Sequence, residues 1–339
     1  MATIAVIGTG YVGLTAGACL ARMGHTVTCV DIDEAKIERL RRGSLPIVEQ
    51  GLEELLREGL ATGRLSFRVD LAAAVADCAF VVLCLPTPSR ADGSADISYV
   101  VEAAREMGGM LPPGAIVVNK STLPIGSTLR VAAALQRSDV HVVSNPEFLR
   151  EGTAVEDFFH PDRIVIGSID REAGQKVAAL YGETTARVII TDPASAEMIK
   201  YASNAFLATK ISFINAVAAI CEQVGADVQD VAAGMGADPR IGAQFLAAGP
   251  GWGGSCFPKD AQAFVTIAAD AGNDFHLLKS VIQTNEEQID RVVAKIAAAV
   301  GGRLVGATIA VWGLTFKAGT DDLRHSPALK GGARLHEAG

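Results

Sequence analysis

The N-terminal segment, residues 1–31, constrains the fold more than any other part of this chain. Residues 3–7 have the apolar composition of a short buried strand, and Gly8-Thr-Gly10-Tyr-Val-Gly13 follows directly. A helical pattern then continues to Met23, and a second apolar strand, residues 26–30, ends at Asp31. This order of features predicts a Rossmann-like dinucleotide site: a strand, the Gly-x-Gly-x-x-Gly motif, a helix, a second strand and an acidic residue.

Each residue of the glycine motif has a physical task in such a site. Gly8 allows the tight turn, Gly10 lets a pyrophosphate approach the backbone, and Gly13 lets the helix pack closely on the strand. Tyr11 and Val12 begin the helix, whose free N–H groups and positive dipole end attract phosphate. These five residues are therefore predicted to bind the cofactor.

The adenosine end of the cofactor is predicted to lie near Asp31. A carboxylate at this position binds a ribose 2′-hydroxyl and repels a 2′-phosphate, so NAD is predicted rather than NADP. Lys36 either reaches the adenosine side as well or is a solvated surface lysine.

The alternation of strands and helical segments continues as it does in a doubly wound α/β sheet. Further strands are expected at residues 79–85, 115–118, 141–143, 163–167 and 187–191. In such sheets, ligands bind beyond the carboxyl ends of the strands. Polar residues after three of these strands are therefore predicted to face the cofactor or substrate, although each alone also suits a cap or turn: Thr87, Thr122, Glu147 and Glu151.

A long helix is expected at residues 194–225, with Asp192 or Ser195 as its cap, because apolar residues recur there at three- and four-residue spacing. Lys200 and Asn204 are four residues apart, so both point in one direction. A helix of this length suits a spine between two domains or a dimer contact, and we expect a homodimer built along it. Shorter helices complete an all-helical central region at residues 227–235, 258–271 and 276–300.

The segment 249–260, Gly-Pro-Gly-Trp-Gly-Gly-Ser-Cys-Phe-Pro-Lys-Asp, contains the strongest candidate for a nucleophile. Its four glycines predict a loop whose backbone lies close to a ligand. Cys256 precedes Pro258, which suits the first turn of a helix, and a thiol at a helix N-terminus favours the thiolate. Lys259 adds positive charge, and Asp260 lies on the same helical face as Cys256. The alternative is a buried structural cysteine beside a tight turn.

The C-terminal end is expected to begin a second α/β domain, with a strand at residues 307–311 followed by a loop and a helix. We therefore expect three regions: 1–193, 194–302 and 303–339. One strand and one helix cannot bury their own apolar faces. The chain is thus expected to be a fragment, or its last stretch packs on the rest.

Composition excludes several classes of protein. Hydrophobic residues make up 49% and charged residues 20%, so the chain can bury a large core, and the net charge of −8 argues against a nucleic-acid partner. The six cysteines include no Cys-x-x-Cys pair, which favours free thiols over a disulfide framework or metal site. No apolar run is expected to approach the length of a membrane span, and the N-terminus does not have the form of a signal peptide. A cytoplasmic protein is predicted.

Several motifs, taken together, resemble one family. They are Gly8–Gly13, Ser121-Thr122, Asn145-Pro-Glu-Phe-Leu-Arg-Glu-Gly152, Lys200-x-x-x-Asn204, Arg240-Ile-Gly242, Gly253–Asp260 and Thr315-Phe-Lys-x-x-Thr-Asp-Asp-x-Arg324. In this order they resemble the UDP-glucose/GDP-mannose dehydrogenases over essentially the whole chain. The resemblance implies an NAD-dependent four-electron oxidation of UDP-glucose at C6 through a thiohemiacetal and thioester on Cys256.

The same resemblance implies roles for the other motif residues. Lys200 and Asn204 would stabilise negative oxygen, Glu147 would act as general acid/base, and Thr122 and Asp260 would organise the hydrolytic water. The residue that takes the first proton is left open. Glu151 and Arg324 would contact the cofactor, and Arg240 would reach the site of a neighbouring subunit. The implied substrate contacts are Glu147, Phe148, Leu149, Lys200, Asn204, Arg240, Phe245, Leu246, Ala247, Gly249, Gly251, Gly253 and Lys317.

Complete members of this family carry a full second Rossmann-like domain, which here is reduced to its first unit. Two alternatives therefore remain at this stage. One is the same chemistry on GDP-mannose or a UDP-N-acetylhexosamine. The other is an inactive NAD-binding dimeric fragment.

Overall fold

The structure is a computed structural model that describes residues 1–182 and 184–339, and it consists of two compact units. The first, called here the sheet unit, comprises Met1–Ala91 and Ala95–Lys200. The second, the helical unit, comprises Asp92–Ser94 and Tyr201–Gly339.

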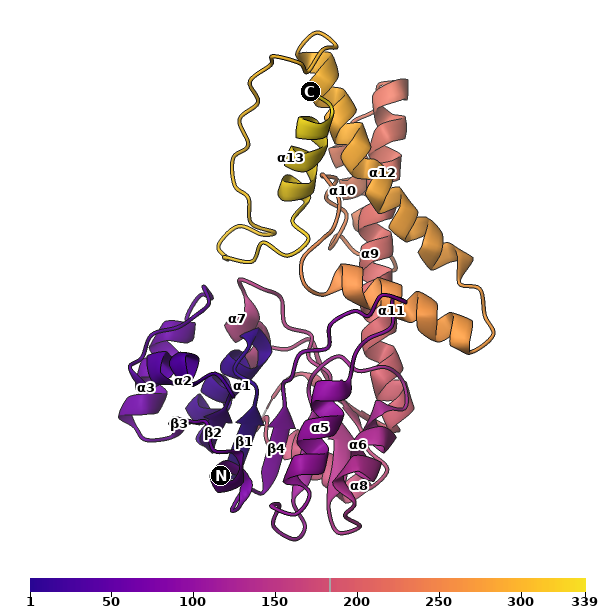
Figure 1. The fold of residues 1–339 in the computed structure, drawn as a ribbon. Helices are drawn as coiled ribbons and strands as arrows, with labels where there is room; N and C mark the ends of the chain where they lie inside the picture. Colours follow the sequence, from indigo (N-terminus) through magenta and orange to yellow (C-terminus); the bar gives the residue numbers. More distant parts are fainter. Residues whose placement is uncertain (183) are drawn as a thin grey trace. The chain divides into compact units, whose positions relative to one another are not determined.

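The sheet unit contains one sheet, with eight strands among the described residues, in the order β3-β2-β1-β4-β5-β6-β7-β8. Figure 1 labels the first four of them, β3, β2, β1 and β4. The strands are β1 (Thr3–Ile7), β2 (Thr26–Val30), β3 (Leu65–Arg68), β4 (Phe80–Leu83), β5 (Ile116–Asn119), β6 (His141–Ser144), β7 (Arg163–Gly167) and β8 (Arg187–Thr191). Neighbouring strands are parallel except for β6 and β7, which pair antiparallel. The order reverses between β1 and β4, so the carboxyl ends of these strands mark the expected ligand crevice.

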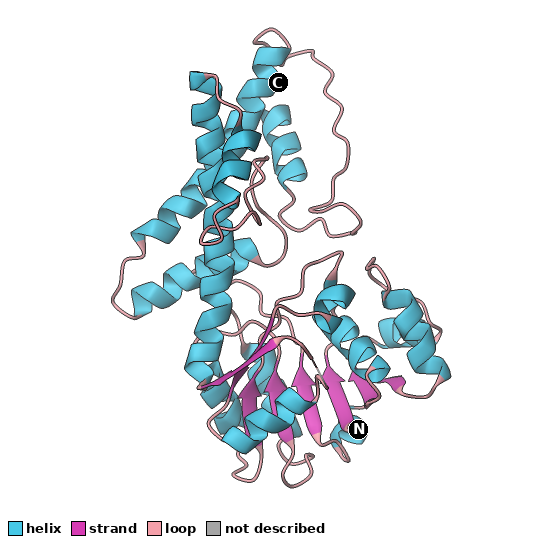
Figure 2. Ribbon diagram, turned by 180° about the vertical axis from the view of Figure 1, so that it is seen from behind, coloured by secondary structure: helices cyan, strands magenta, loops and turns pink. Residues whose placement is uncertain are grey.

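Helices cover both faces of this sheet (Figure 2). They are α1 (Tyr11–Arg22), α2 (Glu34–Arg41), α3 (Leu52–Ala61), α4 (Leu71–Val75), α5 (Ser98–Met107), α6 (Ser127–Leu135), α7 (Ala154–Phe159) and α8 (Arg171–Ala179). Alternate residues of β1 enter two different cores: Ile4 and Val6 pack with α1, α3 and α8, whereas Ala5 and Ile7 pack with α4, α5 and α6. Burial on both faces explains why the strands are continuous apolar runs.

The predicted doubly wound α/β fold is confirmed, and four strands have the bounds expected from the sequence. β3 was not predicted.

The helical unit is organised around α9 (Pro193–Val224), a single helix that starts in the sheet unit, close to the predicted bounds of 194–225. Asp192 is its cap, because its carboxylate accepts the Ser195 N–H at 2.8 Å. The other helices are α10 (Val228–Gly236), α11 (Phe257–Asp270), α12 (His276–Ala299) and α13 (Pro327–Glu337). A third core joins α9, α11 and α12 through Ala208, Trp252, Ala261, Leu278 and Val281.

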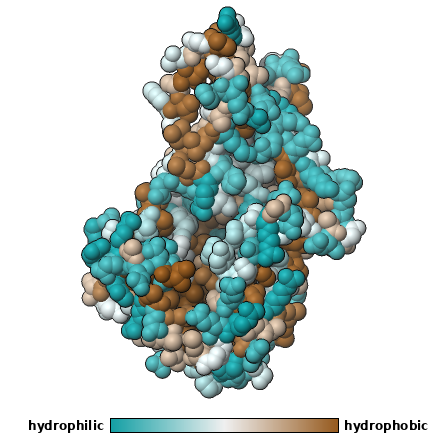
Figure 3. All heavy atoms as spheres, viewed as in Figure 1, coloured by the Kyte–Doolittle hydropathy of each residue, from teal (hydrophilic) through white to brown (hydrophobic). Residues whose placement is uncertain are grey.

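Two expectations were wrong. Residues 307–311 form no strand; they belong to an irregular segment with turns, residues 303–326, that precedes α13. A strand needs a neighbour for its backbone hydrogen bonds, and this segment has none in the described chain. Apolar side chains therefore stay exposed along it, and brown spheres mark this part of the chain in Figure 3. Val305, Val311 and Trp312 are among the exposed residues.

The second wrong expectation concerns apolar runs. By length and composition, α9 is long and apolar enough to cross a membrane, although core helices pass the same test. Its buried polar residues instead make hydrogen bonds within the protein: Glu197 accepts the Thr128 N–H at 2.8 Å, and Lys200 and Asn204 bind carboxylates, as described below.

Candidate active site

The glycine motif in the sheet unit has the geometry that a dinucleotide requires. Gly8 has φ +97°, and a Cβ atom there would lie 2.5 Å from the Cys84 carbonyl oxygen. A Cβ on Gly13 would lie 1.9 Å from the Gly8 carbonyl oxygen, so this glycine brings α1 against the turn. A Cβ on Gly10 would meet no atom within 4 Å, which leaves open space where a pyrophosphate approaches.

The start of α1 also fits an anionic ligand. Its N-cap is Gly10, and no side chain caps the helix. The first N–H groups of a helix have no intrahelical acceptor, so this end attracts phosphate. Tyr11 and Val12 are the first helical residues, as expected.

Asp31 lies directly after β2. Its Oδ2 accepts hydrogen bonds from the Thr9 N–H (3.0 Å) and hydroxyl (2.5 Å) and pairs with Lys36 Nζ at 2.9 Å. Burial raises the pKa of this carboxyl, but the bonds from Thr9 and Lys36 outweigh burial and lower the pKa to about 2. An ionised acid at this point fits the ribose of NAD. Lys36 is thus paired with Asp31 rather than solvated alone.

The loop after β6 and the first turns of α9 bring two candidate catalytic residues together. Glu147 and Lys200 are both buried, and Lys200 Nζ lies 3.1 Å from Glu147 Oε1. The second oxygen of Glu147 accepts the Leu149 N–H at 2.6 Å. The Phe148 ring lies beneath two cations: Lys200 Nζ is 5.2 Å and the Arg163 guanidinium 4.0 Å from its centroid. Phe148 therefore supports the charged groups.

Glu49 joins this loop to the cofactor motif. Its buried carboxylate accepts the Tyr11 hydroxyl, the Gly152 N–H at 2.7 Å and the Ala154 N–H at 2.8 Å. Burial and the hydrogen bond to Glu49 raise the pKa of the Tyr11 phenol above its usual range, so the hydroxyl remains a donor. The sequence analysis missed Glu49, and only the tertiary fold brings it to these partners.

Cys256 is the N-cap of α11, with Pro258 in the first turn, as predicted. It is partly exposed, whereas the remaining cysteines, Cys19, Cys29, Cys78, Cys84 and Cys221, are buried. One turn into the helix, Asp260 is 1% exposed, and its backbone N–H donates to the Cys256 carbonyl at 2.9 Å. Its carboxylate accepts Asn204 Nδ2 and Lys259 Nζ, both at 2.6 Å. Three predicted residues of the helical unit, Asn204, Lys259 and Asp260, thus form one cluster.

The four glycines before Cys256 serve different purposes. A Cβ atom added at Gly251 would lie 2.7 Å from Asn285 Oδ1. One added at Gly253 would lie 2.0 Å from the His325 carbonyl oxygen, and one added at Gly254 would lie 2.6 Å from the Phe316 ring. At Gly249 a Cβ would meet nothing within 4 Å. Three of these glycines therefore avoid clashes with neighbouring protein atoms. From the sequence alone, this purpose could not be distinguished from leaving space for a ligand.

The remaining predicted residues differ in exposure. Thr87 and Leu246 are buried, Thr122, Glu151 and Leu149 are partly exposed, and Phe245 has φ +63°. Lys317 and Arg324 lie on the exposed C-terminal segment. Arg240 has 88% of its side chain exposed and pairs with Asp238 at 2.6 Å. Its position suits a group offered to another molecule.

One side of α9 is apolar and exposed among the residues that the structure describes. Phe206, Phe213 and Ile220 recur at seven-residue spacing and are 65%, 52% and 60% exposed. A heptad stripe of this kind is typical of a helix that packs on another helix.

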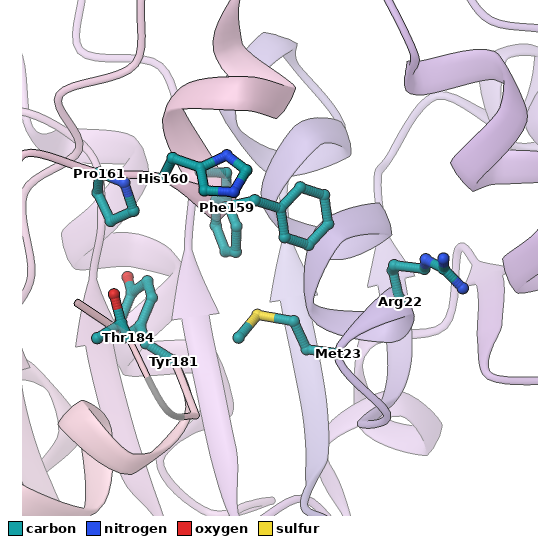
Figure 4. Close-up of a pocket in the computed structure, with 8 residues that line it drawn as sticks. Arg22, Met23, Phe159, His160, Pro161, Tyr181 and Thr184 are labelled. Atoms are coloured by element: carbon teal, nitrogen blue, oxygen red, sulfur yellow. The ribbon is translucent and has the colours of Figure 1, made fainter. Parts of the chain in front are cut away.

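The sheet unit also contains a cavity of about 450 Å³ that none of the predicted site residues lines. Side chains from the ends of α1 and α7 and from the segment after α8 surround it (Figure 4). Its lining residues are Arg22, Met23, Phe158, Phe159, His160, Pro161, Tyr181 and Thr184. We do not assign the chemistry to this cavity. Within residues 1–182 and 184–339, no cluster of three metal-ligating side chains is present.

The chain is similar to known proteins over almost its whole length. Residues 2–185 match the NAD-binding domain of the UDP-glucose/GDP-mannose dehydrogenase family, and residues 194–287 match the central domain of that family. UDP-glucose 6-dehydrogenase of Rhizobium meliloti is 49% identical over 99% of this chain and 79% of that protein.

Solved structures show the same similarity. A UDP-glucose dehydrogenase from Pyrobaculum islandicum matches with a TM-score of 0.95 and 42% identity, over 100% of this chain and 80% of that one. A UDP-D-ManNAc dehydrogenase from Pyrococcus horikoshii matches with a TM-score of 0.89 and 28% identity, over 99% and 81% of the two chains.

Proposed function

Because the chain belongs to the UDP-glucose/GDP-mannose dehydrogenase family and is an NAD-dependent dehydrogenase, we propose that it oxidises UDP-glucose at C6 to UDP-glucuronate. The observation that carries this proposal is the 49% identity to a UDP-glucose 6-dehydrogenase over nearly the whole chain. Identity is lower, 28%, to the UDP-D-ManNAc dehydrogenase and 34% to a GDP-mannose dehydrogenase of Pseudomonas aeruginosa. UDP-glucose is therefore favoured over a UDP-N-acetylhexosamine or GDP-mannose.

The overall reaction converts the C6 CH₂OH group and one water to a carboxylate, with two hydrides lost to two NAD⁺ and three protons released. When bound, NAD⁺ would supply the hydride acceptor for each oxidation. Gly8, Gly10, Gly13, the start of α1 and Asp31 would hold it.

Cys256 supplies the covalent tether in this proposal. Its thiolate adds to the C6 aldehyde, which forms a C–S bond and turns the carbonyl oxygen into an oxyanion. After the second oxidation, C6 is a thioester of Cys256. Water then attacks the thioester carbon, the C–S bond breaks and the thiolate leaves. The partial exposure of Cys256 at the start of α11 supports this role.

Lys200 and Asn204 would donate hydrogen bonds to the C6 oxygen, because they lie one helical turn apart on α9. Without substrate, each is engaged by a carboxylate: Lys200 by Glu147 and Asn204 by Asp260. A substrate oxygen at either donor therefore places a carboxylate nearby that can receive a proton. Glu147 would be the general acid/base, and Asp260 and Thr122 would orient the water.

We also propose a cytoplasmic homodimer that buries the Phe206, Phe213 and Ile220 stripe of α9 and brings Arg240 of each subunit to its neighbour's substrate. The domains proposed for it are residues 1–193 for NAD, 194–302 for dimerisation and catalysis, and 303–339 for the nucleotide sugar. In the last region, Lys317 would contact the sugar and Arg324 the cofactor. The exposure of the stripe and of Arg240 supports this assembly.

The deciding experiment measures NADH formed per UDP-glucose consumed in excess NAD⁺, with GDP-mannose and UDP-N-acetylmannosamine assayed in parallel. Two NADH per sugar support the proposal. If one of the other two sugars is turned over faster than UDP-glucose, that sugar replaces UDP-glucose as the proposed substrate. One NADH per sugar, with aldehyde released, contradicts the tether. No NADH while NAD still binds indicates an inactive NAD-binding fragment. Cys256→Ser should abolish uronate formation, whereas Cys221→Ser, at a buried position on α9, is the matched control.

A further inference from the structure

The loop that leads to Cys256 is held by amide side chains rather than by secondary structure. The Gly249 N–H donates to Asn215 Oδ1, and Gln288 Nε2 donates to the Gly249 carbonyl, both at 2.8 Å. Asn285 binds both backbone groups of Trp252: its Oδ1 accepts the N–H at 2.8 Å, and its Nδ2 donates to the carbonyl at 3.0 Å. Two helices, α9 and α12, thus fix the path of this loop.

Asn285 occupies a position on α12 where an apolar residue is expected. The buried residues of this helix are Leu278, Val281, Asn285 and Ile289, and Asn285 is 6% exposed. A buried amide is costly unless its hydrogen bonds are made. Here they are made to Trp252, so the amide specifies the shape of the loop.

The neighbouring residues are fitted to this amide. Gly251 has φ +112°, and a Cβ there would collide with Asn285 Oδ1 at 2.7 Å. The Trp252 indole donates to Ser212 Oγ at 2.9 Å and packs edge-on against Phe257 with centroids 6.4 Å apart. Phe257 directly follows Cys256 and begins α11. A continuous series of contacts therefore runs from Asn285 through Trp252 to the residue beside the thiol.

We propose that Asn285 is a positioning residue that sets the placement of the Cys256 thiol through Trp252; this inference rests on the proposed function. A nucleophile displaced by about 1 Å loses on the order of a hundredfold in rate. A displaced thiol also captures the C6 aldehyde less efficiently. Loss of Asn285 is therefore expected to let aldehyde escape, which the loss of a purely structural residue would not do.

The test compares Asn285→Leu with Gln283→Leu, an exposed position on the same helix whose amide reaches only Glu287 among the described residues. Asn285→Leu should lower kcat/KM by about ten- to a hundredfold. It should also bring NADH per sugar below two when semicarbazide traps the aldehyde, and leave the Kd for NAD unchanged. Gln283→Leu should behave as the wild type. Two NADH per sugar at wild-type kcat in Asn285→Leu overturns the proposal.

A second measurement needs no substrate, so it separates this inference from the proposed function. The rate of Cys256 alkylation by iodoacetamide, followed by mass spectrometry, should change severalfold in Asn285→Leu and stay constant in Gln283→Leu. An unchanged rate overturns the positioning role even if the wild type oxidises no sugar. If Asn285→Leu does not fold, Gln288→Leu removes the single bond to the Gly249 carbonyl and should shift the same two readouts in the same direction. No shift in that variant counts against the proposal.

Discussion

Lys200 Nζ lies 3.1 Å from Glu147 Oε1, and the two side chains are 4% and 6% exposed. A buried ion pair is weak support for stability as a whole, but removing one partner leaves an uncompensated charge in the interior. We therefore propose that the pair serves chemistry, because it keeps an ammonium and a carboxylate where the substrate oxygen is proposed to bind.

The first prediction follows from this pair. Lys200→Met should lower the free energy of unfolding by about 3–5 kcal/mol, because Glu147 is left buried and unpaired. The double variant Lys200→Met/Glu147→Leu should recover most of this loss. Urea unfolding of the single and double variants measures the coupling. If the loss of unfolding free energy in the double variant equals the sum of the losses in the two single variants, the prediction is wrong.

The second prediction concerns the link between Glu49 and the cofactor motif. Tyr11→Phe removes one hydrogen bond to a buried carboxylate, worth about 1.5–3 kcal/mol. We expect the Kd for NAD to rise about tenfold, because the start of α1 at the glycine motif is then no longer hydrogen-bonded to Glu49. Titration of NAD by calorimetry measures this. Tyr99→Phe, at a half-exposed position of α5, is the control and should not change the Kd.

The third prediction is a pH dependence at Asp31, whose pKa is lowered to about 2. A depressed carboxyl pKa stabilises the fold above the unfolded value of about 3.9, and this stabilisation is lost as pH falls toward the folded value. Asp31→Asn should therefore cost about 1–2 kcal/mol at pH 7, after allowance for solvent screening. Urea unfolding at several pH values should show the difference from wild type narrowing below pH ~4. A constant difference would refute it.

The fourth prediction tests the proposed dimer. Phe213→Glu places a charge in the exposed stripe of α9 and should shift sedimentation at micromolar concentration from dimer to monomer, since burying an unpaired charge in an interface is costly. Ile169→Glu, 76% exposed in the sheet unit, should leave the dimer intact. A monomeric wild type would exclude the assembly.

Local patterns in the sequence were sufficient to predict the elements that depend only on neighbouring residues. The apolar periodicity and the Asp192 cap gave α9 nearly to the residue, and the strand–glycine–helix order gave the cofactor end of the sheet. The start of α11 at Cys256 followed from Pro258. These features depend on contacts within a few residues, which a sequence displays directly.

Long-range contacts could not be predicted in the same way. Glu49 reaches Gly152 and Ala154 across the fold, and nothing near it in the sequence indicates those partners. The strand expected at 307–311 failed for the converse reason: apolar composition is necessary for a strand, but a hydrogen-bonding neighbour is also required. The sequence did not single out Asn285 either, because its role depends on two hydrogen bonds to Trp252, 33 residues away in the chain.

The last prediction uses the two glycines whose surroundings differ most. Gly253→Ala would place a Cβ 2.0 Å from the His325 carbonyl, so the loop or the segment before α13 must move, at a cost of about 1–3 kcal/mol. Gly249→Ala meets open space and has no positive φ, so its effect should stay within about 0.5 kcal/mol. Thermal unfolding of both variants makes the comparison. If Gly249→Ala keeps wild-type stability but loses turnover, the open space at Gly249 belongs to the substrate. If the two variants are destabilised equally, a clash with the His325 carbonyl does not explain why residue 253 is glycine.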